Sequence, residues 1–187
     1  MKQESLARYV LRITFVLLAI SVIVAGLLAL VYRITEPAIA KANERKSQEA
    51  IMQVLPGGYE EEIVDFADES GIVSRVYVGP NGYAIETTPM GFDNTITMMV
   101  GVSMEGNVMG IAIVSHTESA GLGAVAAGKN AKGEAFRNQF IGSSGAVSVN
   151  KDGGEIDAIT SATITSRAVC TGVNAALDCV KGLGGAQ

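Results

Sequence analysis

The residues with the greatest chemical potential lie in one short segment near the C-terminus, at positions 157–166. Six of its ten residues carry a side-chain oxygen, in the order Asp-Ala-Ile-Thr-Ser-Ala-Thr-Ile-Thr-Ser. A helical pattern follows, because later apolar residues recur on one face: Val169, Val173, Ala176, Leu177 and Val180. Backbone N–H groups at a helix start lack internal partners and carry partial positive charge. The segment could therefore hold a phosphate.

The same hydroxyl groups have a simpler interpretation. Ser and Thr before a helix commonly cap it, accepting a hydrogen bond from a backbone N–H group of the first turn. Gly182 and Gly184 then end the helix in the usual way. From the residue types alone, capping is the expected role, and phosphate binding is the alternative.

The residues from Asp157 to Thr163 resemble the flavinylation motif of the FMN-binding subunits of Rnf complexes and of Na⁺-translocating NADH:quinone reductase. In that family an aspartate is followed, after two residues, by Ser or Thr, usually Gly, and then Ala-Thr. The final Thr carries FMN through a phosphoester bond, so the resemblance implies that Thr163 is the covalent attachment site. Ser161 stands where Gly is usual, and a positive φ at that position would strain it.

The resemblance also implies roles for the neighbours of Thr163. The hydroxyl groups of Thr160, Ser161 and Thr165, together with the N–H groups around Ala162, would contact the FMN phosphate. Asp157 is an acid beside an anion, which is unfavourable without a cation. Its implied role is to help the flavin transferase that modifies the chain to bind Mg²⁺.

A second block, at residues 116–123, reads His-Thr-Glu-Ser-Ala-Gly-Leu-Gly. By itself it would indicate only a flexible loop, but it is similar to a further block of the same family, with Ala120 where Pro is frequent. The resemblance implies that Glu118 bonds a ribityl hydroxyl or a ring nitrogen. It also implies that three residues lie against the flavin ring: Gly121, Leu122 and Gly123.

Residues 13–32 contain no charged side chain, and twenty helical residues span about 30 Å, the thickness of the hydrocarbon core. Three basic residues and one acidic residue precede this run. The positive-inside tendency then keeps the N-terminus in the cytoplasm and places the rest of the chain outside. Residues 38–40 resemble a signal-peptidase site, but the apolar run is longer than a usual signal sequence. We predict that residues 1–35 are a cytoplasmic N-terminus and transmembrane anchor in the lipid bilayer.

The remainder predicts a helical stalk at residues 36–58, ended by Pro-Gly-Gly, and an extracytoplasmic domain at residues 59–187. Alternating patterns around turn residues predict a four-strand antiparallel meander, with strands at residues 72–78, 83–87, 95–104 and 108–115. A glycine-rich loop at 119–133 and a short helix at 132–140 precede the last helix. The fold class is therefore α+β: a single N-terminal transmembrane helix followed by an FMN-binding domain with an antiparallel sheet and flanking helices.

Composition narrows the function further. The net charge is −5, Trp is absent and no basic stripe occurs, so nucleic acid is not an expected partner. His116 is the single histidine, which argues against a multi-histidine metal site. Cys170 and Cys179 are nine residues apart on one predicted helix, which places them on opposite faces with about 13 Å of rise. They cannot form a disulfide with each other and are expected to be core thiols.

Two functions follow as hypotheses. In the first, the chain is a membrane-anchored electron carrier with covalent FMN, a subunit of an ion-translocating ferredoxin:NAD oxidoreductase (Rnf) complex or of its quinone-reductase relative. It would work with other membrane and peripheral subunits and would not be catalytic alone, because it has no dinucleotide-binding glycine motif and no iron–sulfur cysteine cluster. In the second, it is a cofactor-free, membrane-anchored binding or assembly module outside the membrane, and its hydroxyl groups only cap a helix.

Overall fold

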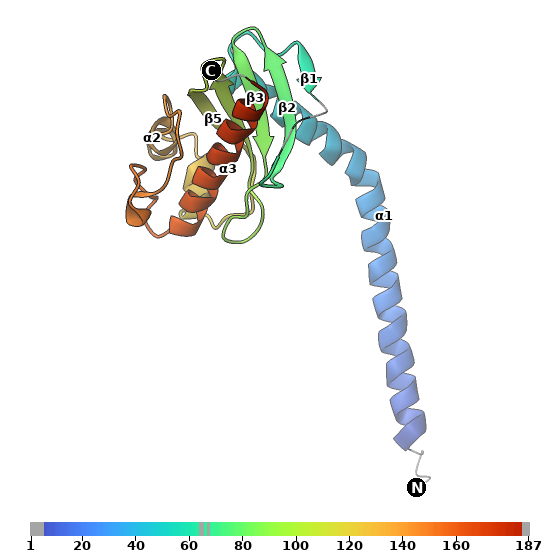
Figure 1. Cartoon of the computed structure of the whole chain (residues 1–187). Helices are drawn as coiled ribbons and strands as arrows, with labels where there is room; N and C mark the ends of the chain where they lie inside the picture. Colours follow the sequence, from blue (N-terminus) through green and yellow to red (C-terminus); the bar gives the residue numbers. More distant parts are fainter. Residues whose placement is uncertain (1–5, 64–65, 67, 185–187) are drawn as a thin grey trace. The chain divides into compact units, whose positions relative to one another are not determined.

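The computed structural model describes residues 6–63, 66 and 68–184 of the 187-residue chain. The chain divides into two units, Met1–Glu44 and Arg45–Gln187. The second unit contains the sheet, both shorter α-helices and the residues predicted to form the site. Its architecture is α+β, as predicted (Figure 1).

Helix α1 extends over Leu6–Val54, with Pro37 inside it. Within the described residues it is the one helix long and apolar enough to cross a membrane, judged by length and composition. Its large apolar side chains from Tyr9 to Ile39 are exposed. An all-round apolar surface of this kind is typical of a helix whose solvent is lipid. The predicted anchor and the predicted stalk helix are thus parts of one continuous helix.

The sheet has five antiparallel strands in the order β1-β2-β3-β4-β5. The four predicted strands are confirmed, with small shifts at their ends, as β2 Val73–Gly79, β3 Gly82–Thr87, β4 Thr97–Ser103 and β5 Val108–Ser115. The additional strand, β1 Glu61–Ile63, pairs with β2. Its three residues are too few to show a period of two, which explains why the sequence pattern did not reveal it.

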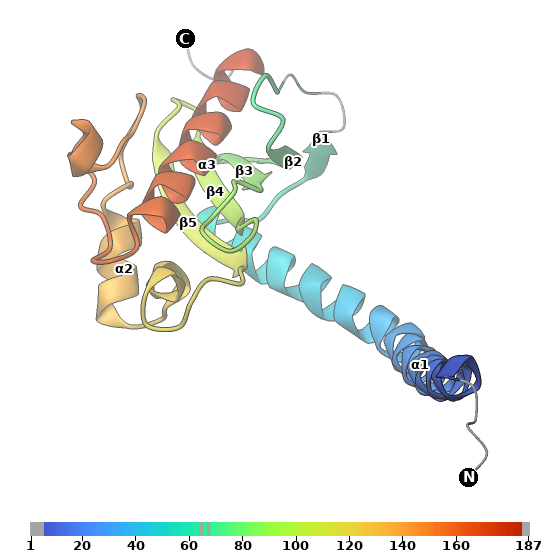
Figure 2. The same cartoon turned by 90° about the horizontal axis from the view of Figure 1, so that it is seen from below.

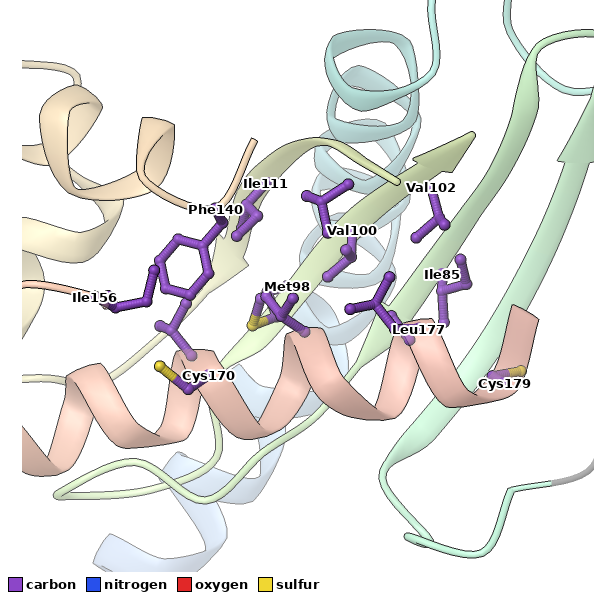
Figure 3. Packing of buried hydrophobic residues seen from close by; sticks show 14 of the residues in the cluster. Ile85, Met98, Val100, Val102, Ile111, Phe140, Ile156, Cys170, Leu177 and Cys179 are labelled. Atoms are coloured by element: carbon purple, nitrogen blue, oxygen red, sulfur yellow. The ribbon is translucent and has the colours of Figure 1, made fainter. Parts of the chain in front are cut away.

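Helix α3, Thr163–Gly182, covers one face of the sheet (Figures 1 and 2). Alternate residues of β4 point to this face, and Met98, Val100 and Val102 are fully or almost fully buried there (Figure 3). The helix lies close to the sheet because Gly172 has no side chain. A Cβ atom at that position would be 2.8 Å from the Met98 sulfur atom.

The other face of the sheet packs against the last turns of α1. Ala50, Ile51, Val54 and Leu55 are buried against residues that alternate with the α3-facing set, namely Tyr77, Ala84, Met99 and Ala112. At Gly101, an added Cβ would overlap the backbone of Val54. The predicted stalk covers residues 36–58, and its C-terminal part packs against the sheet as a second helical layer of the domain.

Three short helical elements complete the unit: η1 Gly123–Ala127, α2 Ala131–Asn138 and η2 Asn150–Asp152. Asn130 caps α2 through a hydrogen bond that its side chain accepts from Gly133 N at 3.0 Å. The Arg137 guanidinium donates to Ala126 O at 2.6 Å and to Gly128 O at 3.0 Å, which joins α2 to η1. The predicted short helix is confirmed, and the predicted loop at 119–133 contains a turn of 3₁₀-helix.

Both cysteines are free, belong to α3 and are buried in the core, as predicted (Figure 3). Cys170 is 4% exposed and Cys179 is 3% exposed. Burial raises the pKa of the Cys170 thiol to about 11 and also raises the pKa of Cys179. Neither thiol is therefore ionised near neutral pH.

Candidate cofactor site at the start of helix α3

A pocket of about 300 Å³ lies where three segments of the second unit meet. The start of α3 supplies all of residues 161–165. The loop after β5 supplies Glu118, Ser119, Leu122 and Gly123, and the connection between β3 and β4 supplies Phe92. These segments are distant in sequence, and the packing of α3 on the sheet brings them together.

Seven of the ten predicted site residues line this pocket: Glu118, Leu122, Gly123, Ser161, Ala162, Thr163 and Thr165. The other three predicted residues, Gly121, Asp157 and Thr160, line a second, more open pocket of about 580 Å³. This second pocket is formed in part by residues 157–160, which directly precede the start of α3. Asp157 is exposed there, and its carboxylate accepts a hydrogen bond from the Asn150 amide at 2.8 Å. The predicted set is thus divided between two adjoining surfaces.

Helix α3 begins without a side-chain cap. Its N-cap residue is Ala162, and no side chain of the described residues accepts a capping hydrogen bond there. The nearby hydroxyl groups have other partners: Thr165 donates to Glu118, and Ser166 donates to Ala162 O at 3.0 Å. The simpler interpretation of the hydroxyl-rich segment, capping, is therefore wrong. N–H groups of the first turn are left for another acceptor.

Thr163, the first residue of α3, is half-buried at this uncapped end. Its hydroxyl oxygen accepts a hydrogen bond from Lys151 Nζ at 3.0 Å. Lys151 belongs to η2, which is held beside α3 by a two-point ion pair of Asp152 with Arg167, at 2.7 Å for each contact. The hydrogen bond from Arg167 lowers the pKa of Asp152. A cation and a helix start therefore meet at the predicted attachment atom.

Ser161 has φ 62°, and it is the one residue other than glycine with positive φ among the described residues. The condition under which Ser would be strained at this position, a positive φ, is therefore met. A left-handed conformation costs a residue with a Cβ atom roughly 1–2 kcal/mol. Strained backbone is concentrated at binding and catalytic sites, and Ser161 lines the pocket.

Glu118 is a buried carboxylate, 7% exposed. One oxygen accepts from Phe92 N at 2.8 Å and from Asp93 N at 3.4 Å, and the other accepts from the Thr165 hydroxyl. Glu118 therefore joins two walls of the pocket. Gly91 and Gly123 lie against this carboxylate, and a Cβ atom on either residue would overlap it.

Sequence reasoning missed four residues of this site: Phe92, Ser119, Lys151 and Ile164. A signal was present for Phe92, because a single aromatic residue among turn formers, in Gly91-Phe92-Asp93-Asn94, is unusual on a solvated turn. Lys151 precedes an Asp-Gly-Gly turn, and nothing local in the sequence points to its contact with Thr163, twelve residues later.

Comparison with known proteins identifies the family of the chain. Residues 91–178 match the family model of the FMN-binding domain, a range that begins at the Phe92 turn and ends within α3. The G subunit of the Na(+)-translocating ferredoxin:NAD(+) oxidoreductase complex of Acetobacterium woodii is 31% identical, over 94% of each chain. The G subunit of the ion-translocating oxidoreductase complex of Methanosarcina acetivorans is 29% identical, over 93% of this chain and 96% of the relative.

A third relative, the G subunit of the ion-translocating oxidoreductase complex of Cereibacter sphaeroides, is 32% identical over 80% of this chain and 74% of its own length. The chain belongs to the family of G subunits of ion-translocating oxidoreductase complexes. The resemblance inferred from the two sequence blocks is thereby confirmed at the level of the family. These relatives are subunits of multi-subunit complexes.

The pocket of this family member fits the two ends of an FMN molecule. At the polar end, the uncapped start of α3 and Lys151 supply N–H donors and a positive charge for a phosphate. At the apolar end, three large side chains line the pocket while remaining substantially exposed: Phe92, Leu122 and Ile164. A flat aromatic ring would cover these exposed surfaces.

Proposed function

We propose that the chain is a membrane-anchored electron carrier of an ion-translocating ferredoxin:NAD oxidoreductase, with FMN esterified to Thr163. One observation carries the proposal. Within the region that matches the FMN-binding domain, the first residue of an uncapped helix presents its hydroxyl to a pocket and to a lysine ammonium group. This is the environment that a phosphoester requires.

The residues of the pocket have distinct tasks in this proposal. Thr163 Oγ1 would carry the phosphate, with Lys151 and the free N–H groups of the first turn balancing its charge. Ser161 would reach the phosphate through its hydroxyl. Bound FMN supplies the group that accepts and releases electrons, and the protein positions and shields it. A covalent bond removes dissociation, which matters where lost cofactor cannot be replaced.

Thr165 and Glu118 have a different task from the one the resemblance implied. Their side chains bond to each other, and the Glu118 carboxylate also holds the turn at Phe92. We assign them to the frame of the pocket. Thr160 and Asp157, which line the adjoining open pocket, would be accessible to the flavin transferase during attachment.

In the membrane, we propose that α1 crosses the bilayer once, with the short N-terminus in the cytoplasm and the second unit outside. Electrons would come from, and pass to, other membrane and peripheral subunits of the same complex. The relatives support the assignment to such a complex because they are named as G subunits of ion-translocating oxidoreductase complexes.

The test is a set of three variants, each produced with a flavin transferase. Thr163→Ala removes the acceptor oxygen and is expected to abolish covalent flavin. Thr163→Ser retains a hydroxyl and is expected to keep it. Thr171→Ala is the matched control, because Thr171 is an exposed threonine on the same helix, and its hydroxyl donates to Arg167 O at 3.0 Å.

Intact mass and in-gel flavin fluorescence give the readout. The wild type, Thr163→Ser and Thr171→Ala should each carry the mass of one FMN moiety, and Thr163→Ala should have the bare chain mass. A flavinylated Thr163→Ala chain would contradict the assignment of the residue. A bare wild-type chain would favour the cofactor-free binding or assembly module instead.

A further inference from the structure

Phe92 is the aromatic residue among those that line the pocket, and 66% of its surface is accessible. Leu122 and Ile164 line the same pocket and are 43% and 49% exposed. A large aromatic side chain buries roughly 150–250 Å² when it is covered, at roughly 25 cal/mol per Å². Side chains of this kind grouped around a pocket indicate a ligand with a flat apolar surface.

The turn that carries Phe92 has a fixed backbone. Gly91 N donates to Asn94 O at 2.8 Å, and Met90 forms an isolated antiparallel bridge with Thr95. Below the turn, Ile96 is almost completely buried, with 1% of its surface exposed. The ring of Phe92 is therefore carried by a hydrogen-bonded turn that packs on the core through Ile96.

Glu118 fixes this turn to the start of α3. Its carboxylate accepts the N–H groups of Phe92 and Asp93, and it also accepts the Thr165 hydroxyl from within α3. These hydrogen bonds join the backbone of Phe92 to the helix start that presents Thr163.

We propose that Phe92 is a cofactor-contacting residue that packs against the flavin ring of the group carried on Thr163. Glu118 is the positioning residue that holds Phe92 there. This inference rests on the proposed function. The tether at Thr163 fixes the phosphate end, whereas the apolar wall of Phe92, Leu122 and Ile164 holds the ring end and excludes water from one of its faces. The ring's electron affinity then depends on this contact.

The experiment introduces an indole at the proposed contact. The chain contains no Trp, so an introduced indole is the only one present. An indole in contact with a flavin quenches its fluorescence by electron transfer, and the effect vanishes at longer range. Phe92→Trp is compared with Ile141→Trp, whose position is 52% exposed but lines a separate groove with Gln53 and Met109.

In the full-length, flavinylated chain, Phe92→Trp should lose most of its fluorescence per attached flavin, and Ile141→Trp should fluoresce like the wild type. Equal fluorescence in the two variants would overturn the inference. Intact mass counts the attached flavin in every sample. A wild type without flavin would therefore refute the proposed function, whereas a loaded but unquenched Phe92→Trp chain would refute only the contact.

The role of Glu118 is tested in the Phe92→Trp background. Glu118→Gln can still accept from the Phe92 N–H and meet the Thr165 hydroxyl, so the quenching should persist. Glu118→Ala frees the turn, so fluorescence should return toward the Ile141→Trp value. Unchanged quenching in the Glu118→Ala double variant would show that Glu118 does not position Phe92. If the Glu118→Ala double variant fails to fold, the Glu118→Gln double variant decides. Loss of quenching in that chain would contradict the role of Glu118 as a hydrogen-bond acceptor that positions Phe92.

Discussion

The first turn of α3 and the rest of the same helix, which we call its body, differ in burial, capping and backbone strain. The body is buried on its apolar side, with Val169, Val173 and Leu177 at 2% exposure or less. The first turn has no side-chain cap among the described residues, follows a strained Ser161 and exposes Ile164. Local rules are obeyed where the helix stabilises the domain and violated where it lines the pocket. Such violations are expected at functional sites, which is consistent with the role that we propose for this helix start.

The sharpest way to break this comparison is to truncate one side chain in each region. Leu177→Ala leaves a cavity in the core and should lower the free energy of unfolding by about 2–5 kcal/mol. Ile164→Ala removes a side chain that is 49% exposed and should cost less than about 1 kcal/mol. Denaturant unfolding of the full chain in detergent, followed by circular dichroism, measures both. Equal losses would remove the distinction between the two regions.

The body of α3 and the sheet could be predicted from the sequence because their signals are local. Apolar residues recurring every three or four positions identified α3, and alternation around Gly-rich turns identified β2 to β5. Strand β1 was missed because three residues show no period. Val54 and Leu55, which the sequence pattern places at the end of the stalk helix, pack against the sheet, a tertiary contact that no local pattern reveals.

The site was predicted only in part, for a related reason. The motif around Thr163 and the block containing Glu118 were found by resemblance, and the glycine usual at position 161 raised the question of a positive φ, which Ser161 has. Phe92 and Lys151 depend on tertiary contacts that bring distant segments together, through Glu118 and Thr163 respectively. Composition and periodicity contain no information about such contacts.

The pH dependence of stability tests the buried part of α3 separately, through Cys170. Burial raises the pKa of Cys170 from 9.0 to about 11, so the folded chain keeps a proton that the unfolded chain releases in this interval. The unfolded state then binds fewer protons, and stability falls as the pH rises from 9 to about 11. The loss should reach about 2 kcal/mol.

Cys170→Ala is the control for this series. It should be less stable near neutral pH because it leaves a small cavity, and its stability should fall less steeply above pH 9, with only Cys179 left to contribute. Denaturant unfolding at several pH values gives both curves. Parallel curves for the two chains would show that Cys170 ionises no differently in the folded and unfolded states.

The smallest expected effect comes from relieving the strain at the helix start. Ser161→Gly removes the Cβ atom from a residue at φ 62°. The gain from the relaxed native state exceeds the added entropy of the unfolded chain, so stability should rise by up to about 1 kcal/mol. The midpoint of thermal unfolding measures it, with Gly142→Ala, also at positive φ, as a destabilising counterpart. A destabilised Ser161→Gly chain would contradict the assignment of strain.

The most direct test of the account is peptide mapping by mass spectrometry of the chain purified from its native membrane. We predict that the peptide containing Thr163 carries the mass of one FMN moiety, with fragment ions that place it on Thr163 and on neither Thr160 nor Thr165. An unmodified Thr163 peptide, from a host with an active flavin transferase, would contradict the central claim that this helix start holds a covalent flavin.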